Sequence, residues 1–368
     1  MPTPMIVCLS TDSIAAEYST RLAVDAGYRV IKLETAGGDP LRTRRGRFAD
    51  FLLAGKESVL LGDGGLQGKA LQDLLDHCAG IVADEAGRDT LLQQTGRTPL
   101  APLVVVGERD AGTLRGMSGS HSDEFLAFHG SGLGFITPRV MPGYPSAGPL
   151  CPQANLLEFL TGLYGAIALF SLMGQSASTD IRSASAGLCA AALPLLRREI
   201  SSALLEGTQP HRAERIWKVS PAEVHRCSDG WLFVDVIEDI QWTRLCNWMG
   251  KPELGIDPHY ITREQRFADS ETLCAILDAF FADKPQACWM EAQAGGVPVA
   301  PVNSLHDLLG DPQLAARGFW GSLTDASGQT QRAPLSPLAR LFGTDATPLH
   351  VCAPGAHTKA VIASLETA

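Results

Sequence analysis

The chain has 368 residues, 45% of them hydrophobic and 19% charged, so it can form packed cores and is not an intrinsically disordered protein. Its formal net charge of -10 argues against a broad positive surface, and we therefore expect neither a nucleic-acid nor a membrane partner. The nine cysteines are scattered without a CxxC pair, which favours reduced thiols in the cytoplasm over a zinc site or a disulfide framework.

The first hundred residues alternate between strand and helix patterns. Met5–Leu9 is an apolar run typical of a buried strand, and residues 11–13 offer caps for a helix that runs to Asp25. A second strand is expected at 28–33. Further strands are expected at 58–61, 80–83 and 102–106, and a helix at 66–77. This order predicts an open parallel α/β sheet with ligand loops at the strand ends.

The middle of the chain predicts a long loop followed by apolar helices. Residues 107–148 are rich in Gly, Ser and Pro and predict irregular structure with one short helix at 123–129. Two long helices are expected at 156–173 and 184–205, with a strand at 179–183 between them. The first is shorter than the roughly 20 apolar residues of a membrane span, so we expect a buried core helix.

Glu158 is the only charged residue between 148 and 173. A carboxylate that enters an apolar helix is costly to ionise unless it has a partner or a chemical task. We therefore take Glu158 as the first candidate catalytic residue.

The remainder predicts a second, smaller unit. Residues 207–220 suit a linker, and residues 223–227 and 231–236 flank the turn SDG as a β-hairpin would. Helices are expected at 241–249, 270–282 and 286–294, strands at 319–323 and 330–332, and a closing helix at 356–365. The sequence contains no HExxH motif and no nucleophile elbow, so neither a catalytic metal nor a serine hydrolase is indicated.

Four arginines fall within six residues, at positions 42, 44, 45 and 47. Such a run suits the binding of a phosphorylated ligand, and equally a solvated loop or a subunit contact.

Several separated stretches resemble one family. They are TRLAVDAGYRVIKLETAGGDPLR, GKESV, TGLYGAIALFSL, DGWLFVDV, QWTRLCNWMGKPEL, GVPVAPVNSLHDLLGDPQLAARGF and GAHTKAVI. In this order they resemble the class III CoA-transferases, the CaiB/BaiF family that includes formyl-CoA transferases and α-methylacyl-CoA racemases. The resemblance implies an open Rossmann-like α/β large domain, formed by residues 1–206 and 319–368. A linker at 207–220 would lead to an inserted α+β domain at 221–318, and two chains would interlock as a homodimer.

The resemblance also implies a reaction. The catalytic carboxylate of the family is an Asp four residues before the Gly of the long helix, and that position is Glu158, counted back from Gly162. The carboxylate would attack an acyl-CoA and form first a mixed anhydride, then an enzyme-linked CoA thioester that an acceptor carboxylic acid resolves. Coenzyme A and acyl-CoA would be substrates, and no permanently bound cofactor is expected. The glycine-rich loop of formyl-CoA transferases has no counterpart between 206 and 226.

Further site residues follow from matched positions. His121 lies where racemases carry a catalytic His, so a racemase with His121 and Glu158 as its acid/base pair is one alternative, and an exposed loop His is another. Glu124 matches a neighbouring acid that orients the site or caps a helix. Arg42 and Lys56 match positions near the CoA channel, where a phosphate contact and a surface or dimer role are equally expected. A CoA-binding protein without catalysis remains a further alternative.

Overall fold

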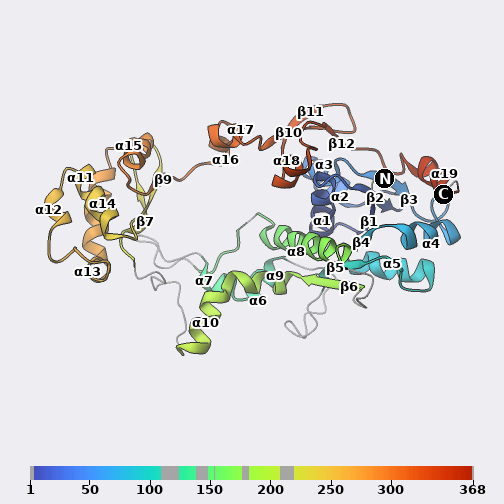
Figure 1. Ribbon diagram of the computed structural model, residues 1–368, viewed down its shortest axis with the longest axis horizontal. Helices are drawn as coiled ribbons and strands as arrows, with labels where there is room; N and C mark the ends of the chain where they lie inside the picture. The colour runs from blue at the N-terminus through green and yellow to red at the C-terminus, as the bar shows by residue number, and fades with distance from the viewer. Residues whose placement is uncertain are drawn as a thin grey trace. The chain divides into compact units, whose positions relative to one another are not determined.

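The computed structural model describes residues 4–108, 124–137, 148–152, 154–175, 182–207 and 219–366. The chain divides into two compact units (Figure 1). Unit 1 is formed by Met1–Arg212 and Pro312–Ala368, and unit 2 by Ala213–Asp311. Unit 1 thus contains both ends of the chain. Its second segment begins at Pro312, whereas the sequence placed that boundary at 319.

Unit 1 is built on a six-stranded parallel sheet. Its strands are β1 (Met5–Leu9), β2 (Arg29–Glu34), β3 (Glu57–Leu60), β4 (Gly80–Ala83), β5 (Leu103–Glu108) and β6 (Ser183–Gly187). They lie in the order β3-β2-β1-β4-β5-β6, and every neighbouring pair is parallel. This is the strand order of a doubly wound Rossmann-like sheet, in which ligands bind where the order reverses, beside β1. The prediction of a large parallel sheet is confirmed.

Helices cover both faces of this sheet (Figure 1). The helices are α1 (Ile14–Asp25) and α8 (Leu156–Met173) on one face, and α4 (Gly68–His77), α5 (Glu85–Thr95) and α19 (Thr358–Glu366) on the other. Alternate residues of β1 point to opposite faces, as a strand requires. Ile6 and Cys8 pack with α1 and α8, while Val7 and Leu9 pack with α4, α5 and α19.

Helix α8 is the only helix among the described residues that is long and apolar enough to cross a membrane by composition. In unit 1 it packs against α1, β5 and β6, and Leu157, Ala166 and Leu169 are buried there. Helix α8 thus contributes to the core, but only 39% of it is buried, so the expected buried core helix is confirmed only for the face that meets the sheet and α1.

The expected helix at 184–205 is wrong in its first half. Residues Ser183–Gly187 form the edge strand β6, which pairs with β5. The next segments are α9 (Leu188–Ala192), a 3-10 turn (Leu193–Leu196) and α10 (Arg197–Leu205). Pro194 interrupts the helix because it offers no backbone N–H, and the small side chains of SASAG fit the strand beside β5. Helices α2 (Leu41–Arg44), α3 (Arg47–Leu53), α6 (Glu124–Gly130) and α7 (Leu133–Ile136) complete this part of unit 1.

Unit 2 pairs a three-stranded antiparallel sheet with helices. Its elements are β7 (Ala222–Arg226), β8 (Trp231–Asp235), α11 (Asp239–Trp248), α12 (Pro252–Gly255), α13 (Arg263–Ala268), α14 (Ser270–Phe281), α15 (Trp289–Ala294), β9 (Val299–Pro301) and α16 (Leu305–Leu309). Strands β7 and β8 form the expected hairpin. Leu232, Trp242 and Phe281 lie in its core.

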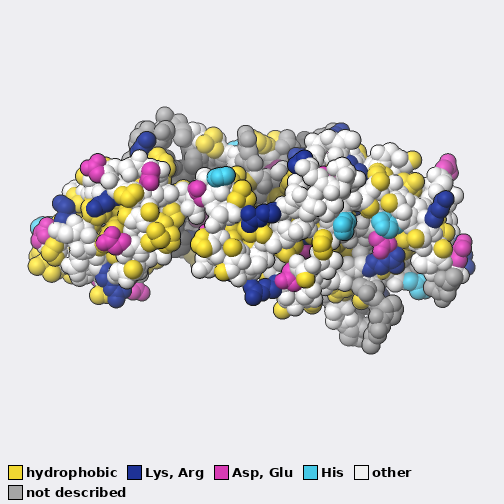
Figure 2. All heavy atoms as spheres, turned by 90° about the horizontal axis from the view of Figure 1, so that it is seen from above, with side chains coloured by type: hydrophobic (Ala, Val, Ile, Leu, Met, Phe, Trp, Pro, Cys, Tyr) yellow, Lys and Arg dark blue, Asp and Glu magenta, His cyan; other side chains and the backbone are white. Residues whose placement is uncertain are grey.

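The chain returns to unit 1 through short elements. They are α17 (Pro312–Ala316), β10 (Trp320–Thr324), β11 (Thr330–Pro334), α18 (Pro337–Phe342) and β12 (Leu349–His350). The strands form a small sheet in the order β11-β10-β12. Figure 2 shows positive and negative side chains interspersed on the face it displays, without a broad positive area, in keeping with the net charge of -10.

Candidate active site

Glu158 lies in the first turn of α8, where it meets the beginning of another helix. The Ala15 backbone N–H, in the first turn of α1, donates a hydrogen bond to Glu158 Oε2 at 3.1 Å. The first N–H groups of a helix have no partner within the helix, so Glu158 satisfies one of the open donors of α1. The positive end of the α1 dipole also faces this carboxylate. Both helices start at the carboxyl edge of β1, where the sheet order reverses.

Two glycines of α8 make this meeting possible. A Cβ added at Gly162 would lie 2.7 Å from the Ala15 carbonyl oxygen, and one added at Gly165 would lie 2.5 Å from Ser19 Oγ. The Ser19 hydroxyl donates to the Gly162 carbonyl at 2.7 Å, across the two helices. The spacing LTGLYG therefore lets α1 and α8 pack closely enough for Ala15 to reach Glu158.

The surroundings of Glu158 raise its pKa to about 7. Burial is the largest cause, and the neighbouring carboxylates of Glu124 and Asp12 act in the same direction. The Ala15 N–H and the Arg45 guanidinium oppose these effects by favouring the charged form. A carboxyl group with this pKa is divided between its two forms near neutral pH, which is typical of catalytic groups.

Glu124 lies beside Glu158 in the structure. Its Oε1 accepts a hydrogen bond from the Leu157 N–H at 2.9 Å, so it caps the first turn of α8. This contact fixes the residue that precedes Glu158. The geometry suits the orienting role that the resemblance implies.

Arg45 lies in the turn between α2 and α3, next to the same site. On one side of it, Arg44 forms an ion pair with Asp12 at 2.7 Å, at the start of α1. On the other side, the Phe48 ring packs against Phe159 at 5.9 Å between centroids, next to Glu158. Arg45 itself is exposed and pairs with no carboxylate in the described part of the chain. It is a free cation at the mouth of the site, within the arginine run singled out from the sequence.

Lys56 and Arg42 do not offer free cations to a CoA phosphate. The Lys56 side chain is 1% exposed, and its amine donates to Glu17 and to Thr20 Oγ1. The Arg42 guanidinium binds both carboxylate oxygens of Glu34 and donates to the Cys352 carbonyl at 2.9 Å. Both side chains therefore make internal ion pairs, and the two roles expected for them, a phosphate contact and a surface or dimer role, stay predictions.

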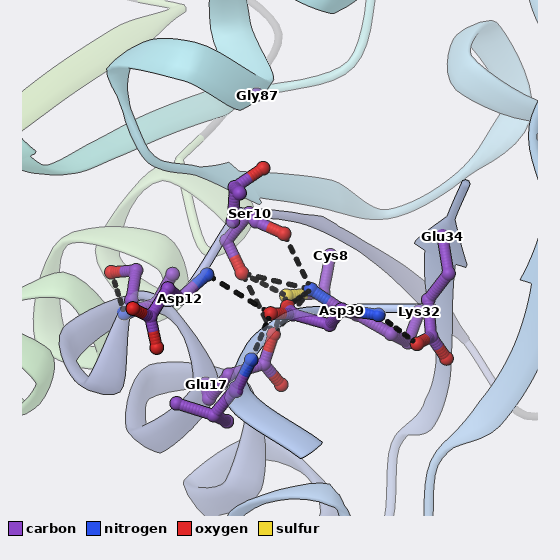
Figure 3. Close-up of polar contacts among 12 residues, drawn as sticks. Cys8, Ser10, Asp12, Glu17, Lys32, Glu34, Asp39 and Gly87 are labelled. Carbon is purple, nitrogen blue, oxygen red and sulfur yellow. Dashed lines mark hydrogen bonds and ion pairs between the residues drawn. The ribbon is translucent and has the colours of Figure 1, made fainter. Parts of the chain in front are cut away.

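Lys56 and Arg42 belong to a buried ionic network that was not predicted from the sequence. Figure 3 shows its centre, around Glu17, Lys32 and Asp39. Glu17, Lys32 and Asp39 are all buried, and Lys32 binds Glu17 Oε1 at 2.6 Å and Asp39 Oδ2 at 2.7 Å. The pairing of Glu17 with Lys32 and Lys56 could not be predicted, because these residues meet only in the folded chain.

The predicted residue His121 lies outside the described residues, so the structure does not test the racemase pair. Among the described residues, no group of three His, Cys, Asp or Glu side chains is placed to hold a metal ion.

With this geometry in view, the chain can be compared with known proteins. A family model described as CoA-transferase family III matches residues 116–358. The chain belongs to CoA-transferase family III. It is therefore an enzyme of the CoA-transferase class, and the family expected from the sequence is confirmed.

Curated relatives of this CoA-transferase align over most of its length. It is 26% identical to the succinate–glutarate CoA-transferase of Agrobacterium fabrum, over 96% of this chain and 93% of that protein. It is 26% identical to the succinyl-CoA–D-citramalate CoA-transferase of Chloroflexus aurantiacus, over 83% of this chain and 79% of the relative. The acetyl-CoA:oxalate CoA-transferase of Acetobacter aceti is 23% identical, over 86% and 84%.

Solved structures share the fold of this CoA-transferase. A CaiB/BaiF family protein from Brucella suis superposes with a TM-score of 0.76 at 21% identity, and the match covers 98% of each chain. A protein from Mycobacterium tuberculosis matches with a TM-score of 0.74 at 18% identity, again over 98% of each chain.

Proposed function

We propose that this enzyme transfers coenzyme A between carboxylic acids with Glu158 as its nucleophile. The observation that carries the proposal is the half-buried Glu158 carboxylate, held through Oε2 by the Ala15 N–H. No described residue donates a hydrogen bond to its other oxygen, Oε1. One oxygen is therefore oriented while the other can attack.

The chemistry then proceeds in two exchanges at Glu158. Oε1 attacks the thioester carbonyl carbon and the C–S bond breaks. The products are a mixed anhydride between Glu158 and the donor acid, and CoA as a thiolate. The thiolate attacks the glutamyl carbonyl, a C–O bond breaks, and the donor acid departs as its carboxylate. The acceptor carboxylate then attacks the carbonyl carbon of the glutamyl thioester, the C–S bond breaks, and a second mixed anhydride and the CoA thiolate form. The thiolate attacks the acceptor carbonyl carbon of this anhydride, the C–O bond to Glu158 breaks, and the acceptor acyl-CoA and the free Glu158 carboxylate are released. No net proton, water or redox partner is required.

The environment of Glu158 supports each attack. A desolvated carboxylate is more reactive than a hydrated one because it has less water to shed. The Ala15 N–H and the start of α1 can also stabilise negative charge that develops on oxygen during the exchanges.

We further propose that the acids exchanged are dicarboxylic acids. The names of the first two relatives above contain succinate or succinyl-CoA with glutarate or citramalate, acids with two carboxyl groups. The name of the third pairs acetyl-CoA, whose acid has one carboxyl group, with the dicarboxylic acid oxalate. The exposed Arg45 guanidinium supports this choice because it can bind the carboxylate that does not react. Succinyl-CoA with glutarate is a suitable first pair for assays.

The nucleophile is tested by trapping. Enzyme incubated with succinyl-CoA and then with hydroxylamine should carry a glutamyl hydroxamate on the peptide that contains Glu158, detected by mass spectrometry. Glu158→Gln should form no adduct and should lose at least about 10³-fold in kcat, because an amide cannot act as the nucleophile. An active enzyme with an unmodified Glu158 peptide would overturn the proposal.

A further inference from the structure

Glu17 is a fully buried acid in the first turn of α1, the turn that supplies the Ala15 N–H to Glu158. Its Oε1 binds the Lys32 amine at 2.6 Å and accepts from Ser10 Oγ at 2.7 Å. Its Oε2 binds the Lys56 amine. Both oxygens are therefore held by groups from β2, from the end of β1 and from the residue before β3.

Lys32 extends the same network to the other side of the β1–α1 turn. Its amine also donates to the Ser10 carbonyl at 2.8 Å and binds Asp39 Oδ2 at 2.7 Å. Asp39 Oδ1 in turn accepts from the Asp12 N–H at 3.0 Å. Asp12 has a φ of 55°, a conformation that non-glycine residues seldom adopt without support. The turn from Ser10 to Ser13 is thus held through Ser10 by Glu17 and Lys32, and through Asp12 by Asp39 (Figure 3).

The charges of this network balance. Glu17 and Asp39 face Lys32 and Lys56, and all four residues are at most 5% exposed. Burial disfavours the charged form of Glu17, but Lys32 and Lys56 outweigh it and lower the pKa of Glu17 below its ordinary value. The pKa of Lys32 is raised despite its burial, through Glu17 and Asp39. The pairing therefore favours the charged forms of Glu17 and Lys32.

Stability alone does not call for such an arrangement. Well-packed apolar side chains often serve a core as well as buried ion pairs do, because the pairs must first lose their water. What an ionic network adds is a defined geometry. Here the geometry is that of the first turn of α1, from Ser13 to Glu17, which includes Ala15.

We propose that Glu17 is a positioning residue for the reaction: with Lys32 and Lys56 it fixes the first turn of α1, so that the Ala15 N–H holds the Glu158 carboxylate. This inference rests on the proposed role of Glu158 as the nucleophile. Glu17 lies in the core of unit 1 and acts through Ala15 without touching the substrate.

The variant Glu17→Gln keeps the side-chain shape and removes its charge. Displacement of the Ala15 N–H should lower kcat about 10- to 100-fold, since an error of roughly 1 Å at a reacting group costs that much. The KM for acyl-CoA should stay within about twofold, because the substrate contacts are unchanged. The pH at which single-turnover adduct formation is half-maximal should rise by about one unit, since a hydrogen bond to the charged form of Glu158 is lost.

Asp25→Asn is the matched control. Asp25 is a buried acid in the last turn of the same helix and pairs with Arg21. It should lower thermal stability as Glu17→Gln does, but leave the pH midpoint and the kcat of the folded enzyme near wild type. Both variants leave the charged neighbours of Glu158 intact, namely Glu124, Asp12 and Arg45.

A milder variant tests the inference even if Glu17→Gln does not fold. Ser10→Ala removes one hydroxyl contact with Glu17 and one with Lys32 but keeps every charge. It should shift the pH midpoint in the same direction by a smaller amount. Wild-type kcat and pH midpoint in folded Glu17→Gln, or in Ser10→Ala should the first variant not fold, would overturn the inference.

Failure of the proposed function would give a different result from failure of the positioning role. In that case the wild-type enzyme itself would form no adduct at Glu158 in the hydroxylamine assay. An adduct in the wild type, together with an unshifted Glu17→Gln, would reject the positioning role alone.

Discussion

Glu158 combines a structural cost with a chemical advantage. Burial and the carboxylates of Glu124 and Asp12 raise its pKa to about 7. Under the proposed function, the same desolvation that makes the charged form costly makes it a better nucleophile. Unlike Glu17, which has two lysine partners, Glu158 has one backbone donor and the influence of Arg45. We therefore expect ionisation of Glu158 to lower the free energy of unfolding, while the proposed reaction depends on that ionised form.

The variant Glu158→Gln should therefore be more stable than the wild type at alkaline pH. The folded-state pKa lies above the unfolded value, so ionisation of Glu158 destabilises the fold fully above about pH 7 and not at all below about pH 4. The gain should be roughly 2 kcal/mol at pH 8.5 and should shrink as the pH falls to 5. Urea unfolding of both proteins at the two pH values measures it.

Asp63→Asn, which changes an exposed acid of unit 1, is the control and should give no pH-dependent difference. If the gain from Glu158→Gln were the same at both pH values, the raised pKa would be refuted.

Arg45 should determine the choice of acid. Arg45→Ala should lower kcat/KM for glutarate as acceptor about 10- to 100-fold, because a charge-assisted contact with the distal carboxylate is lost. With butyrate, which lacks that carboxylate, the change should be less than about threefold. Arg45→Lys should recover part of the loss. Initial rates with both acids measure the difference.

Arg47→Ala removes another exposed arginine of the same run, one that contacts Gln329 instead. It should leave both acids unaffected. An equal loss for glutarate and butyrate in Arg45→Ala would contradict a distal-carboxylate contact.

At the scale of elements, the pairing of α1 with α8 places the site. Gly162 is the tightest point relevant to Glu158, since an added Cβ would meet the Ala15 carbonyl oxygen at 2.7 Å and Tyr18 Cβ at 3.1 Å. Neither is the free end of a flexible side chain. A methyl group at this position must therefore push the helices apart.

Gly162→Ala should consequently lower kcat by about 100-fold, through displacement of Ala15 from Glu158. It should also destabilise the fold by about 1 to 3 kcal/mol through overpacking. Gly174→Ala, just after the other end of α8, is the control, because the added Cβ would lie no nearer than 3.3 Å to another atom, the Phe170 carbonyl oxygen. Steady-state kinetics and thermal unfolding of both variants decide the matter, and wild-type kinetics in Gly162→Ala would argue against close packing as the source of the geometry.

The sequence predicted elements best where a single periodicity ran unbroken. The strands at Met5–Leu9 and Gly80–Ala83 and the helix Leu156–Met173 were expected with the bounds that the structure has. The segment 184–205 failed because Ala and Ser are compatible with strand as well as helix, and its pairing with β5 is a tertiary contact.

The site was predictable only in part for the same reason. Glu158 stood out as a lone charge in an apolar stretch, but its donor is a backbone N–H, which no side-chain pattern reveals. Lys56 and Arg42 looked available because their partners, Glu17 and Glu34, are brought to them only by the fold.

In the whole molecule, the described part of unit 1 exposes apolar side chains on α8, which carries Glu158, and on α10. Leu163 and Ile167 on α8 are 43% and 52% exposed, and Leu204 and Leu205 on α10 are 78% and 85% exposed. Such surfaces favour a protein partner, and we propose the homodimer that the resemblance implies.

Light scattering at micromolar concentration should give twice the chain mass of 39.1 kDa. Leu204→Glu combined with Leu205→Glu should shift the distribution toward monomer, because a charge buried in an interface costs several kcal/mol. A monomeric wild type would exclude the homodimer.

The hydrogen bond between Ala15 and Glu158 joins positions 143 residues apart in the chain. In a growing polypeptide, Ala15 is therefore synthesised long before Glu158, and the two can meet only after α8 has formed and packed against α1. Contacts of such long range form slowly, because the loop between them must close first. Under the proposed role of Glu158, reactivity toward acyl-CoA should therefore arise only in chains in which α8 has packed against α1.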